Sequence, residues 1–425
     1  MASLIIFSLV LCSFSIAADA QQRQFNISLG SSLKPNTKNS SWVSPSGLYA
    51  FGFYPQGNGY AVGVFLAGIP QKTVVWTARR DDPPVSSDVT LLFSSDSGLV
   101  LRSAQGQNTN IVPASQSASS ASVSDSGNFV IYDSNQQIIW QSFDHPNDTL
   151  LPGQRLQAGT ELFSSVSETD KSKGIFRIKM QNDGNLVQYP VETPDTGEYA
   201  YWASGTDGSG ENVTLNLDPN GHLYLLNAKG VNIKDLEQGG NLTNETIYSA
   251  KIDADGIFRL YSYNLTENGN WSIAWSSTKD KCSPKGLCGL NGYCTLNDLE
   301  PQCECIPGFS PVHQGNRSSG CERNFVAESC KEENVSTKYS IQELANTVWL
   351  ENSYSTLSSA SKGDCEKACL EDCNCEAVFY EDGQCKKQSL PLKYGRTDPG
   401  NSNSALIKVG MLKSVSDPGL DRIVP

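Results

Sequence analysis

Histidine and clustered basic residues are scarce in this 425-residue sequence, and their scarcity excludes two classes of function. The three histidines, His145, His222 and His313, lie far apart, so neighbouring residues cannot form a multi-histidine metal site. No Lys/Arg-rich run occurs, and the formal net charge is -13. Because nucleic-acid binding needs clustered cations to neutralise phosphates, we expect no nucleic-acid partner. We likewise expect no metal ion and no cofactor.

Long hydrophobic runs are also absent, with one exception at the start of the chain. Residues 4–17 are almost all apolar and precede Ala18-Asp19-Ala20, which has the small-x-small form of a signal-peptidase site. About 14 apolar residues are too few to cross roughly 30 Å of hydrocarbon, so we expect residues 1–20 to be a cleaved signal peptide. The C-terminal tail, residues 411–425, has no apolar span. The sequence therefore predicts an exported chain without a membrane span.

Cysteine is missing from residues 25–277 but abundant afterwards. Of 13 cysteines, Cys12 belongs to the leader, and the remaining twelve lie between Cys282 and Cys385. An even number of cysteines in an exported chain predicts six disulfides rather than zinc sites. Asn-x-Ser/Thr sequons are candidate glycosylation sites in the same compartment; they are Asn26, Asn39, Asn147, Asn212, Asn241, Asn244, Asn264, Asn270, Asn316 and Asn334.

The cysteine-free part has the pattern of an all-β fold. Short runs rich in Val, Ile, Tyr and Phe alternate with Gly, Asp, Asn and Ser clusters. A turn of the form Asp-x-Gly followed by a short strand recurs. It begins at Asp96 and Asp125, recurs as Asp-Gly without the middle residue at Asp183, and appears more loosely at Asp218 and Asp255. We interpret these repeats as two β modules, separated near the Pro- and Gly-containing segment 140–153. His145 in that segment is expected to be a packed structural histidine.

The cysteine-rich part contains the best helix signal in the sequence. Residues 362–372 place Cys365 and Cys369 four positions apart on one helix face, with Asp364 as the expected N-cap. The first six cysteines alone allow fifteen pairings, so spacing does not fix the disulfides. The segment 278–281 lacks paired acidic ligands, so we expect no Ca²⁺ before Cys282.

Three phrases of this sequence resemble plant G-type lectin S-receptor-like proteins with an S-locus glycoprotein type of ectodomain. They are Val75-Trp76-Thr77-Ala78-Arg79-Arg80-Asp81, the segment 140–153 and the segment 181–189. The resemblance implies a mainly β fold made of two bulb-type lectin (type II β-prism) modules, an EGF-like module and an α+β PAN/apple module. The implied ranges are signal peptide 1–20, lectin modules 21–150 and 151–277, EGF-like module 278–322, PAN/apple module 323–410 and tail 411–425.

The sequence departs from the family in two respects. Arg79 stands where the family usually has Asn. Family receptors continue into a transmembrane helix and a Ser/Thr kinase, and the motifs of a kinase are not found in these residues. We therefore expect a non-catalytic chain. Its localisation would be extracellular, in the apoplast, whereas family members are usually anchored in the plasma membrane.

The segment 181–189 matches the bulb-lectin mannose motif Gln-x-Asp-x-Asn-x-Val-x-Tyr. On a strand, alternate side chains share one face, which here would combine a carboxylate, two amides, a phenol and an apolar contact. Sugar hydroxyls donate and accept hydrogen bonds, so this mixture suits a hexose. By resemblance, Asp183 and Asn185 would hold the hydroxyl at C2, Gln181 that at C3 and Tyr189 that at C4, while Val187 would touch the ring carbons.

The resemblance also implies the disulfide pairing. An EGF-like module pairs its cysteines first with third, second with fourth and fifth with sixth. The implied bridges are Cys282–Cys294, Cys288–Cys303 and Cys305–Cys321 in that module, and Cys365–Cys385, Cys369–Cys375 and Cys330–Cys373 in the PAN/apple module.

Two functions remain open at this stage. The intact motif at 181–189 favours recognition of mannose-type glycans or glycoproteins. The other repeats depart from the motif, with Ser124 and Ser126 in place of Gln and Asp, and with His222 and Ile257 in place of Asn. This degeneracy favours a protein-interaction ectodomain, with homo- or heterodimerisation through the PAN/apple or EGF-like modules. A secreted hydrolase is a distant third hypothesis, because no paired carboxylates or nucleophile elbow stand out.

Overall fold

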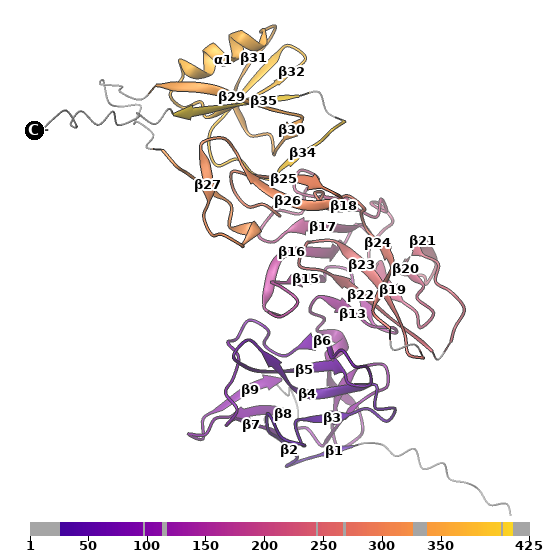
Figure 1. The fold of residues 1–425 in the computed structure, drawn as a ribbon. Helices are drawn as coiled ribbons and strands as arrows, with labels where there is room; N and C mark the ends of the chain where they lie inside the picture. Colours follow the sequence, from indigo (N-terminus) through magenta and orange to yellow (C-terminus); the bar gives the residue numbers. More distant parts are fainter. Residues whose placement is uncertain are drawn as a thin grey trace, which may run out of the picture.

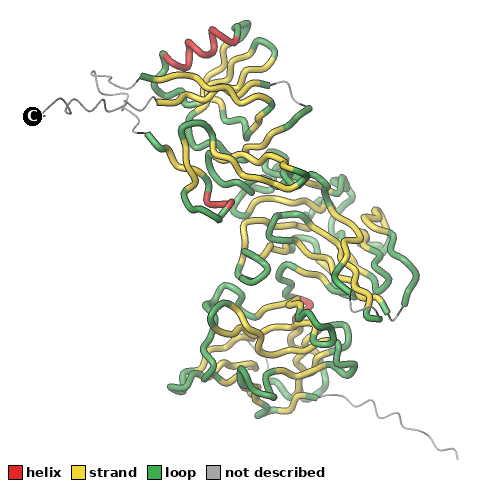
Figure 2. Tube along the Cα trace, in the orientation of Figure 1, coloured by secondary structure: helices red, strands yellow, loops and turns green. Residues whose placement is uncertain are grey.

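The computed structural model describes residues 26–96, 98–112, 117–243, 245–266, 269–325, 338–400 and 403–410. The described chain is arranged as a column, with two β domains in sequence order and a cysteine-rich region at the far end (Figure 1). Strands dominate every part, and helix is confined to a few short segments (Figure 2). Among the described residues, no helix has the length and hydrophobicity needed to span a bilayer. The expected signal peptide and C-terminal tail lie outside the described residues.

The first β domain is a three-sided prism. Its sheets are β1-β10-β11-β12, β2-β7-β8-β9 and β3-β4-β5-β6. Each sheet sends a fully buried phenylalanine to a common core, Phe51, Phe93 and Phe129, and the rings of Phe51 and Phe129 stack with centroids 3.9 Å apart. Its strands are β1 (Ile27–Ser28), β2 (Ser32–Leu33), β3 (Ser41–Val43), β4 (Tyr49–Gln56), β5 (Gly59–Leu66), β6 (Thr73–Thr77), β7 (Thr90–Ser94), β8 (Gly98–Arg102), β9 (Asn108–Val112), β10 (Ser120–Val123), β11 (Phe129–Tyr132) and β12 (Ile138–Gln141), followed by the 3-10 helix η1 (Ser142–Asp144).

The second β domain repeats this architecture. Its sheets are β13-β22-β23-β24, β14-β19-β20-β21 and β15-β16-β17-β18. Phe176, Leu215 and Phe258, one from each sheet, are fully buried in its core. Its strands are β13 (Thr149–Leu150), β14 (Arg155–Leu156), β15 (Glu161–Ser165), β16 (Lys173–Met180), β17 (Leu186–Pro190), β18 (Trp202–Ala203), β19 (Thr214–Leu217), β20 (Leu223–Leu226), β21 (Asn232–Glu237), β22 (Thr246–Ile252), β23 (Phe258–Asn264) and β24 (Ser272–Ser276).

The Asp-x-Gly repeats of the sequence form hairpin turns in both prisms. They connect β7 to β8, β10 to β11, β16 to β17, β19 to β20 and β22 to β23. Gly127 and Gly184 occupy positive φ angles of 85° and 92°, which an L side chain adopts only with strain. The mainly β interpretation of residues 25–277 is therefore confirmed.

A half-buried arginine, Arg80, joins the two prisms. Arg80 extends from the end of β6 and donates to the backbone carbonyls of Phe163, Ser164, Lys171 and Ser172 at 2.8–3.1 Å. These carbonyls all belong to the second prism, so one guanidinium satisfies four of its acceptors. At the same junction, His145 packs its ring against Trp140 with centroids 5.4 Å apart. This placement agrees with the expected structural role of that histidine.

The cysteine-rich region has three sheets in the described residues, β26-β25-β34-β30, β27-β28 and β29-β35-β32-β33-β31, and the first combines strands from both sides of the expected module boundary between residues 322 and 323. Strand β25 pairs in parallel with β34, which comes 100 residues later, through Tyr293↔Gly395 and Cys294↔Arg396. Its strands are β25 (Gly292–Asn297), β26 (Glu300–Cys305), β27 (Phe309–Pro311), β28 (Cys321–Arg323), β29 (Tyr339–Ala345), β30 (Thr347–Val348), β31 (Ser353–Leu357), β32 (Ala377–Glu381), β33 (Gln384–Gln388), β34 (Gly395–Thr397) and β35 (Ser404–Gly410), with the 3-10 helix η2 (Arg317–Ser319). The segments expected to form the EGF-like and PAN/apple modules are therefore connected by backbone hydrogen bonds as well as by the chain.

The structure contains five of the bridges that the resemblance implies: Cys282–Cys294, Cys288–Cys303, Cys305–Cys321, Cys365–Cys385 and Cys369–Cys375. Cys373 is also disulfide-bonded, but Cys330, the partner implied for it, lies outside the described residues.

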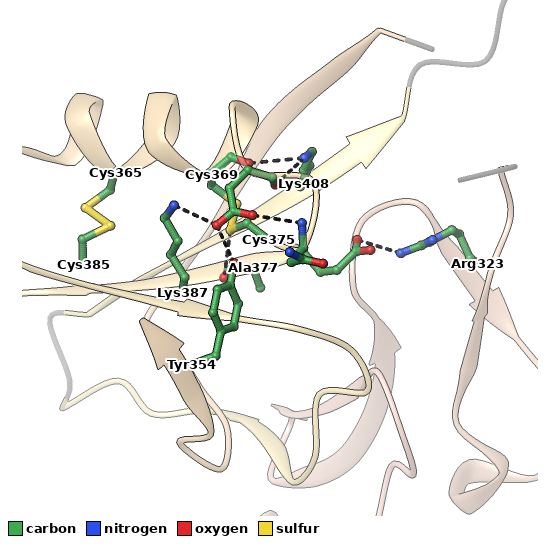
Figure 3. The surroundings of a disulfide bond; sticks show 12 residues. Arg323, Tyr354, Cys365, Cys369, Cys375, Ala377, Cys385, Lys387 and Lys408 are labelled. Carbon is green, nitrogen blue, oxygen red and sulfur yellow. Dashed lines mark hydrogen bonds and ion pairs between the residues drawn. A yellow bond between two sulfur atoms is a disulfide. The ribbon is translucent and has the colours of Figure 1, made fainter. Parts of the chain in front are cut away.

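Helix α1 (Lys362–Leu370) covers the sheet of strands β29-β35-β32-β33-β31. Its N-cap is Ser361 rather than Asp364, which corrects the sequence-based expectation. Asp364 is instead the third helical residue and completes a capping box with Ser361. At the other end, the Lys408 ammonium donates to the carbonyls of Cys369 and Asp372 (Figure 3). This cation therefore adds charge-assisted hydrogen bonds to two carbonyls at and just beyond the helix C-terminus, where the helix dipole favours positive charge.

Candidate functional site

The five motif residues lie on the hairpin that connects β16 to β17, but only two of them lie on a strand. Strand β17 begins at Leu186, so Val187 and Tyr189 follow the expected alternation, whereas Gln181, Asp183 and Asn185 belong to the turn. The expectation that all five share one strand face is corrected in this respect. The turn brings them together because the backbone N–H of Gln181 donates to the carbonyl of Asn185 at 2.8 Å.

Asp183 and Asn185 each commit part of the side chain to folding and leave the rest unused. Oδ1 of Asp183 accepts the backbone N–H of Asn185 at 3.0 Å, and Oδ1 of Asn185 accepts from Ser204 Oγ at 3.0 Å and from the Thr206 N–H at 3.2 Å. Among the described residues, neither Oδ2 of Asp183 nor Nδ2 of Asn185 has a hydrogen-bond partner. The turn therefore presents one carboxylate acceptor beside one amide donor.

Gln181 links this pair to the strand. Its Nε2 donates to the Tyr189 hydroxyl oxygen at 2.9 Å, while its Oε1 has no partner among the residues described. The accepted bond orients the phenol, so the Tyr189 O–H retains its own proton for donation. Burial raises the pKa of Tyr189, so the phenol stays protonated at neutral pH.

The two strand residues of the motif, Val187 and Tyr189, are buried by other side chains of the protein. Val187 and Tyr189 are each only 2 % exposed, whereas Asp183 is exposed and Gln181 and Asn185 are partly so. Their cross-strand partners on β16 are Lys179 and Arg177, which share the same sheet face. The three polar turn residues are thus accessible, while the two strand residues lie beneath neighbouring side chains.

An ion-pair network lies over these two strand residues. It consists of Arg177, Lys179, Glu161 and Asp195, and we call these four side chains the cover. Arg177 bonds Glu161 Oε1 at 2.9 Å and Asp195 Oδ1 at 2.7 Å, and Lys179 approaches the same two carboxylates at 3.2 and 2.7 Å. Partial burial of Asp195 opposes its ionisation, but hydrogen bonds from Lys179 and Arg177 outweigh that effect and lower its pKa. The carboxylate is therefore ionised at neutral pH and holds both cations in place.

The corresponding hairpin of the first prism, between β10 and β11, has the same backbone but different chemistry. Ser124 and Ser126 replace Gln181 and Asp183 and bond each other at 2.7 Å. Asn128 uses Oδ1 to accept from Ser142 Oγ and Nδ2 to donate to Gln141 Oε1 at 2.8 Å. At the motif positions this turn has no carboxylate, and Asn128 already donates one of the two N–H groups of its Nδ2. The carboxylate of Asp125, in the same turn, accepts from the backbone N–H and the hydroxyl of Ser46.

A third hairpin, between β19 and β20, carries His222 in place of the motif asparagine. Its ring stacks on Tyr224 with centroids 4.0 Å apart and contacts Asp235 at 2.7 Å. The imidazole is thus engaged by its own neighbours. In the hairpin between β22 and β23, Ile257 occupies the asparagine position and is 1 % exposed. Both observations agree with the structural role expected for these loose repeats.

Most candidate glycosylation sites that the structure describes lie at the surface. Asn147 and Asn264 are partly buried, and Asn244 and Asn334 lie outside the described residues. The exposed sequon asparagines are Asn26, Asn39, Asn212, Asn241, Asn270 and Asn316. Occupancy of all ten sites stays a prediction.

Two family descriptions match the chain: D-mannose binding lectin over residues 73–162 and the S-locus glycoprotein domain over residues 239–313. The G-type lectin S-receptor-like serine/threonine-protein kinase LECRK3 of Oryza sativa subsp. indica is 31% identical and aligns over 96% of this chain and 54% of its own length. This chain is a homologue of the G-type lectin S-receptor-like kinases. A second relative, the receptor-like kinase RLK1 of Arabidopsis thaliana, is 29% identical over 91% of this chain and 50% of its own length.

The G-type lectin homologue thus spans about half the length of the curated relatives it matches. Solved structures that resemble it include a monomeric mannose-binding lectin from Gastrodia elata, with 25% identity over 31% of this chain and 96% of that chain and a TM-score of 0.23. The snowdrop (Galanthus nivalis) agglutinin complexed with methyl-α-D-mannoside aligns at 24% identity over 29% of this chain and 94% of that chain, with a TM-score of 0.22.

Sequence reasoning missed the residues that cover the motif. Arg177 lies four residues before Gln181, and Asp195 lies in the segment after β17. The alternation of Arg177 and Lys179 along β16 places both side chains on the motif's face once the hairpin register is known. That register was the available signal, because the Asp-x-Gly turn fixes which residues of the two strands oppose each other.

Proposed function

We propose that this chain is an extracellular carbohydrate-recognition protein whose ligand is a mannose-type glycan or glycoprotein. The observation that carries the proposal is the unused acceptor of Asp183 beside the unused donor of Asn185, with the free Oε1 of Gln181 close by. A sugar hydroxyl donates one hydrogen bond and accepts others, so a pair of adjacent hydroxyls fits this arrangement. The turn is accessible, and two backbone hydrogen bonds close it, from the Gln181 N–H to the Asn185 carbonyl at 2.8 Å and from the Gly184 N–H to the Gln181 carbonyl at 3.2 Å.

The proposed role is binding without catalysis, and the proposed location is the apoplast. The five described disulfides agree with an oxidising compartment. Each hydrogen bond to a sugar contributes only about 0.5 to 1.5 kcal/mol net, so one shallow site binds a monosaccharide weakly. Useful affinity therefore requires a multivalent glycan, or a homo- or heterodimer formed through the PAN/apple or EGF-like parts.

The proposal is tested by exchanging the two side chains that carry it. In the variant Asp183→Asn with Asn185→Asp, both Oδ1 acceptors used in folding are kept and the net charge is unchanged. Only the free atoms change, because the donor and the acceptor trade places. We expect wild-type protein to be retained on mannose-bearing resin and eluted by methyl α-mannoside, and the exchange variant to pass through.

Two controls accompany this experiment. Equal melting temperatures and near-ultraviolet circular dichroism of the two proteins show that the fold is preserved. The second control replaces the corresponding asparagine of the first prism. Asn128→Asp is expected to leave retention on the mannose-bearing resin unchanged, because Nδ2 of Asn128 is already bonded to Gln141. Equal retention of wild type and exchange variant would remove residues 181–189 as the binding site.

A protein-interaction ectodomain is the second candidate function. It is favoured by the near-complete burial of Val187 and Tyr189, which leaves only the turn for a sugar, and by the degenerate hairpins elsewhere. In that case the prisms act as scaffolds. Failure of wild-type protein to bind any mannose-bearing probe would favour this function over the first.

A further inference from the structure

The guanidinium of Arg177 occupies the space directly above the motif tyrosine. Its central carbon lies 4.8 Å from the centroid of the Tyr189 ring, and the two residues are direct partners in the β16-β17 ladder. A cation above an aromatic face is attracted by the ring quadrupole. Tyr189 is consequently 2 % exposed, although its strand face points away from the core of the prism.

Four acceptors hold Arg177 in this position. Besides Glu161 and Asp195, it donates to the carbonyl of Thr193 at 2.7 Å and to that of Pro190 at 3.3 Å. Its side chain is only 6% exposed, so these bonds are sheltered from competing water. A neutral sugar hydroxyl that approached Tyr189 would have to displace two charge-assisted bonds and would offer one neutral bond in exchange.

The exposed turn is outside this cover. Oδ2 of Asp183 and Nδ2 of Asn185 lie at the hairpin end, whereas Arg177 lies over Tyr189 and Lys179 lies opposite Val187 on the strands. The site is thus divided into an open part, made by the turn, and a closed part, made by Tyr189. By resemblance, the turn would read the hydroxyls at C2 and C3, and Tyr189 would read the hydroxyl at C4.

We infer that Arg177 is a specificity-determining residue that closes the C4-reading part of the site. This inference rests on the proposed function. A chain with the closed cover recognises a hexose through its C2 and C3 hydroxyls and is indifferent to the configuration at C4. Mannose and its C4 epimer talose then bind equally well, which a motif with an accessible tyrosine does not allow.

Lys179 provides the matched control within the same network. It pairs with the same two carboxylates as Arg177, is 23% exposed and lies opposite Val187 rather than over Tyr189. When Arg177 is replaced by alanine, Lys179 still neutralises Glu161 and Asp195, so two unpaired carboxylates are not left behind. When Lys179 is replaced instead, Arg177 still covers the phenol.

The test compares methyl α-mannoside with methyl α-taloside by saturation-transfer NMR, which detects weak ligands. Wild-type protein is expected to bind the two epimers within twofold of each other. Arg177→Ala is expected to prefer the mannoside by at least fivefold, because the Tyr189 O–H becomes available to its C4 hydroxyl. Lys179→Ala is expected to keep the wild-type ratio, and melting curves confirm that each variant is folded.

The outcomes separate this inference from the proposed function. A fivefold preference for mannoside in wild-type protein, or no preference in folded Arg177→Ala, overturns the role of Arg177. If the exchange of Asp183 and Asn185 still abolishes binding in that case, sugar recognition by the turn stands without it. Absence of binding to both epimers in wild type and in Arg177→Ala overturns both.

Discussion

The hairpins at residues 124–132 and 181–189 have the same fold but differ in what their side chains leave unused. In both, the Oδ1 atom of the asparagine accepts from a serine hydroxyl that follows the neighbouring edge strand, Ser142 for Asn128 and Ser204 for Asn185. The serine hydroxyl in turn accepts the next backbone N–H of the hairpin strand. The Oδ1 atom of each asparagine therefore has a structural role in its prism.

The comparison shows which motif atoms are informative about binding. An asparagine at this position is explained by folding alone, because the first prism uses it in the same way without having the glutamine and the aspartate of the motif. Oδ2 of Asp183 and Nδ2 of Asn185 have no such explanation among the contacts described. The proposed sugar recognition thus depends on two unused atoms, Oδ2 of Asp183 and Nδ2 of Asn185, more than on five matching residues.

The largest expected effect concerns the glycines of the two hairpin turns. Neighbouring side chains pack closely against Gly127 and leave more space around Gly184. A Cβ on Gly127 would lie 2.6 Å from Leu151 Cδ1 and 2.8 Å from the Tyr49 ring, whereas one on Gly184 would meet its nearest atoms at 3.0 Å. Both positions also have positive φ. We expect Gly127→Ala to cost about 2–4 kcal/mol and Gly184→Ala about 1–2 kcal/mol of unfolding free energy, measured by denaturant titration. Equal losses would contradict the difference in packing.

The next effect is a gain of binding by the first prism. Ser124→Gln with Ser126→Asp restores the motif around Asn128, Val130 and Tyr132, and Gln141→Ala releases Nδ2 of Asn128. We expect methyl α-mannoside titrations to show an increase from one site to two per chain. The double variant Ser124→Gln with Gln141→Ala, which lacks Ser126→Asp, serves as the control and is expected to keep one sugar site per chain. No change in stoichiometry with a folded triple variant would show that more than these atoms distinguishes the hairpins.

A smaller effect concerns pH and is specific to the second prism. The pKa of Asp195 lies below its ordinary value of 3.8, so its contribution to the cover is complete above the unfolded value and is lost as the pH falls through the lower folded value. We expect the protection of Tyr189 from chemical nitration or iodination to be constant from pH 7 to 5. In the same prism, Asp195→Asn should expose Tyr189 already at pH 7. A change in wild-type protection between pH 7 and 5 would contradict this assignment.

The smallest effect tests a local strain in the first prism. Arg79 has a φ of 45°, a left-handed conformation that asparagine tolerates better than arginine, and its guanidinium pairs with the exposed Asp82. We expect Arg79→Asn to stabilise the protein by about 0.5–1 kcal/mol, measured as a rise in melting temperature, because relief of the strain exceeds the value of one exposed ion pair. A decrease in stability would show that the pairing with Asp82 matters more.

The sequence predicted the repeated elements of the fold because they depend on local signals. The Asp-x-Gly phrases mark hairpin turns wherever the structure describes them, and the resemblance implied five disulfides that the structure contains. Pairing between distant segments was not predictable in this way. The parallel contact of Tyr293 with Gly395 and the insertion of Arg80 between carbonyls of the second prism join residues about 100 and 80 positions apart, and no local pattern encodes either.

The sequence predicted which residues make up the candidate site but not which of them are exposed to solvent. Residue types and spacing identified Gln181, Asp183 and Asn185 as a polar group, and the structure brings them together in a turn. Burial of Val187 and Tyr189 depends on Arg177 and on Asp195, which reaches it from a separate segment. Such a cover is a tertiary feature, because its formation requires the register of β16 and the path of the chain after β17.

The most direct test of the account is a titration of selectively labelled protein with methyl α-mannoside, observed through the side-chain amide signals of asparagine. We predict that the Nδ2 proton signals of Asn185 shift in a saturable manner while those of Asn128 stay fixed, because Nδ2 of Asn128 is held by its bond to Gln141 and its turn lacks the motif carboxylate. Shifts at Asn128 alone, or no shift at Asn185 up to saturating sugar, would contradict the claim that the hairpin at 181–189 recognises a hexose.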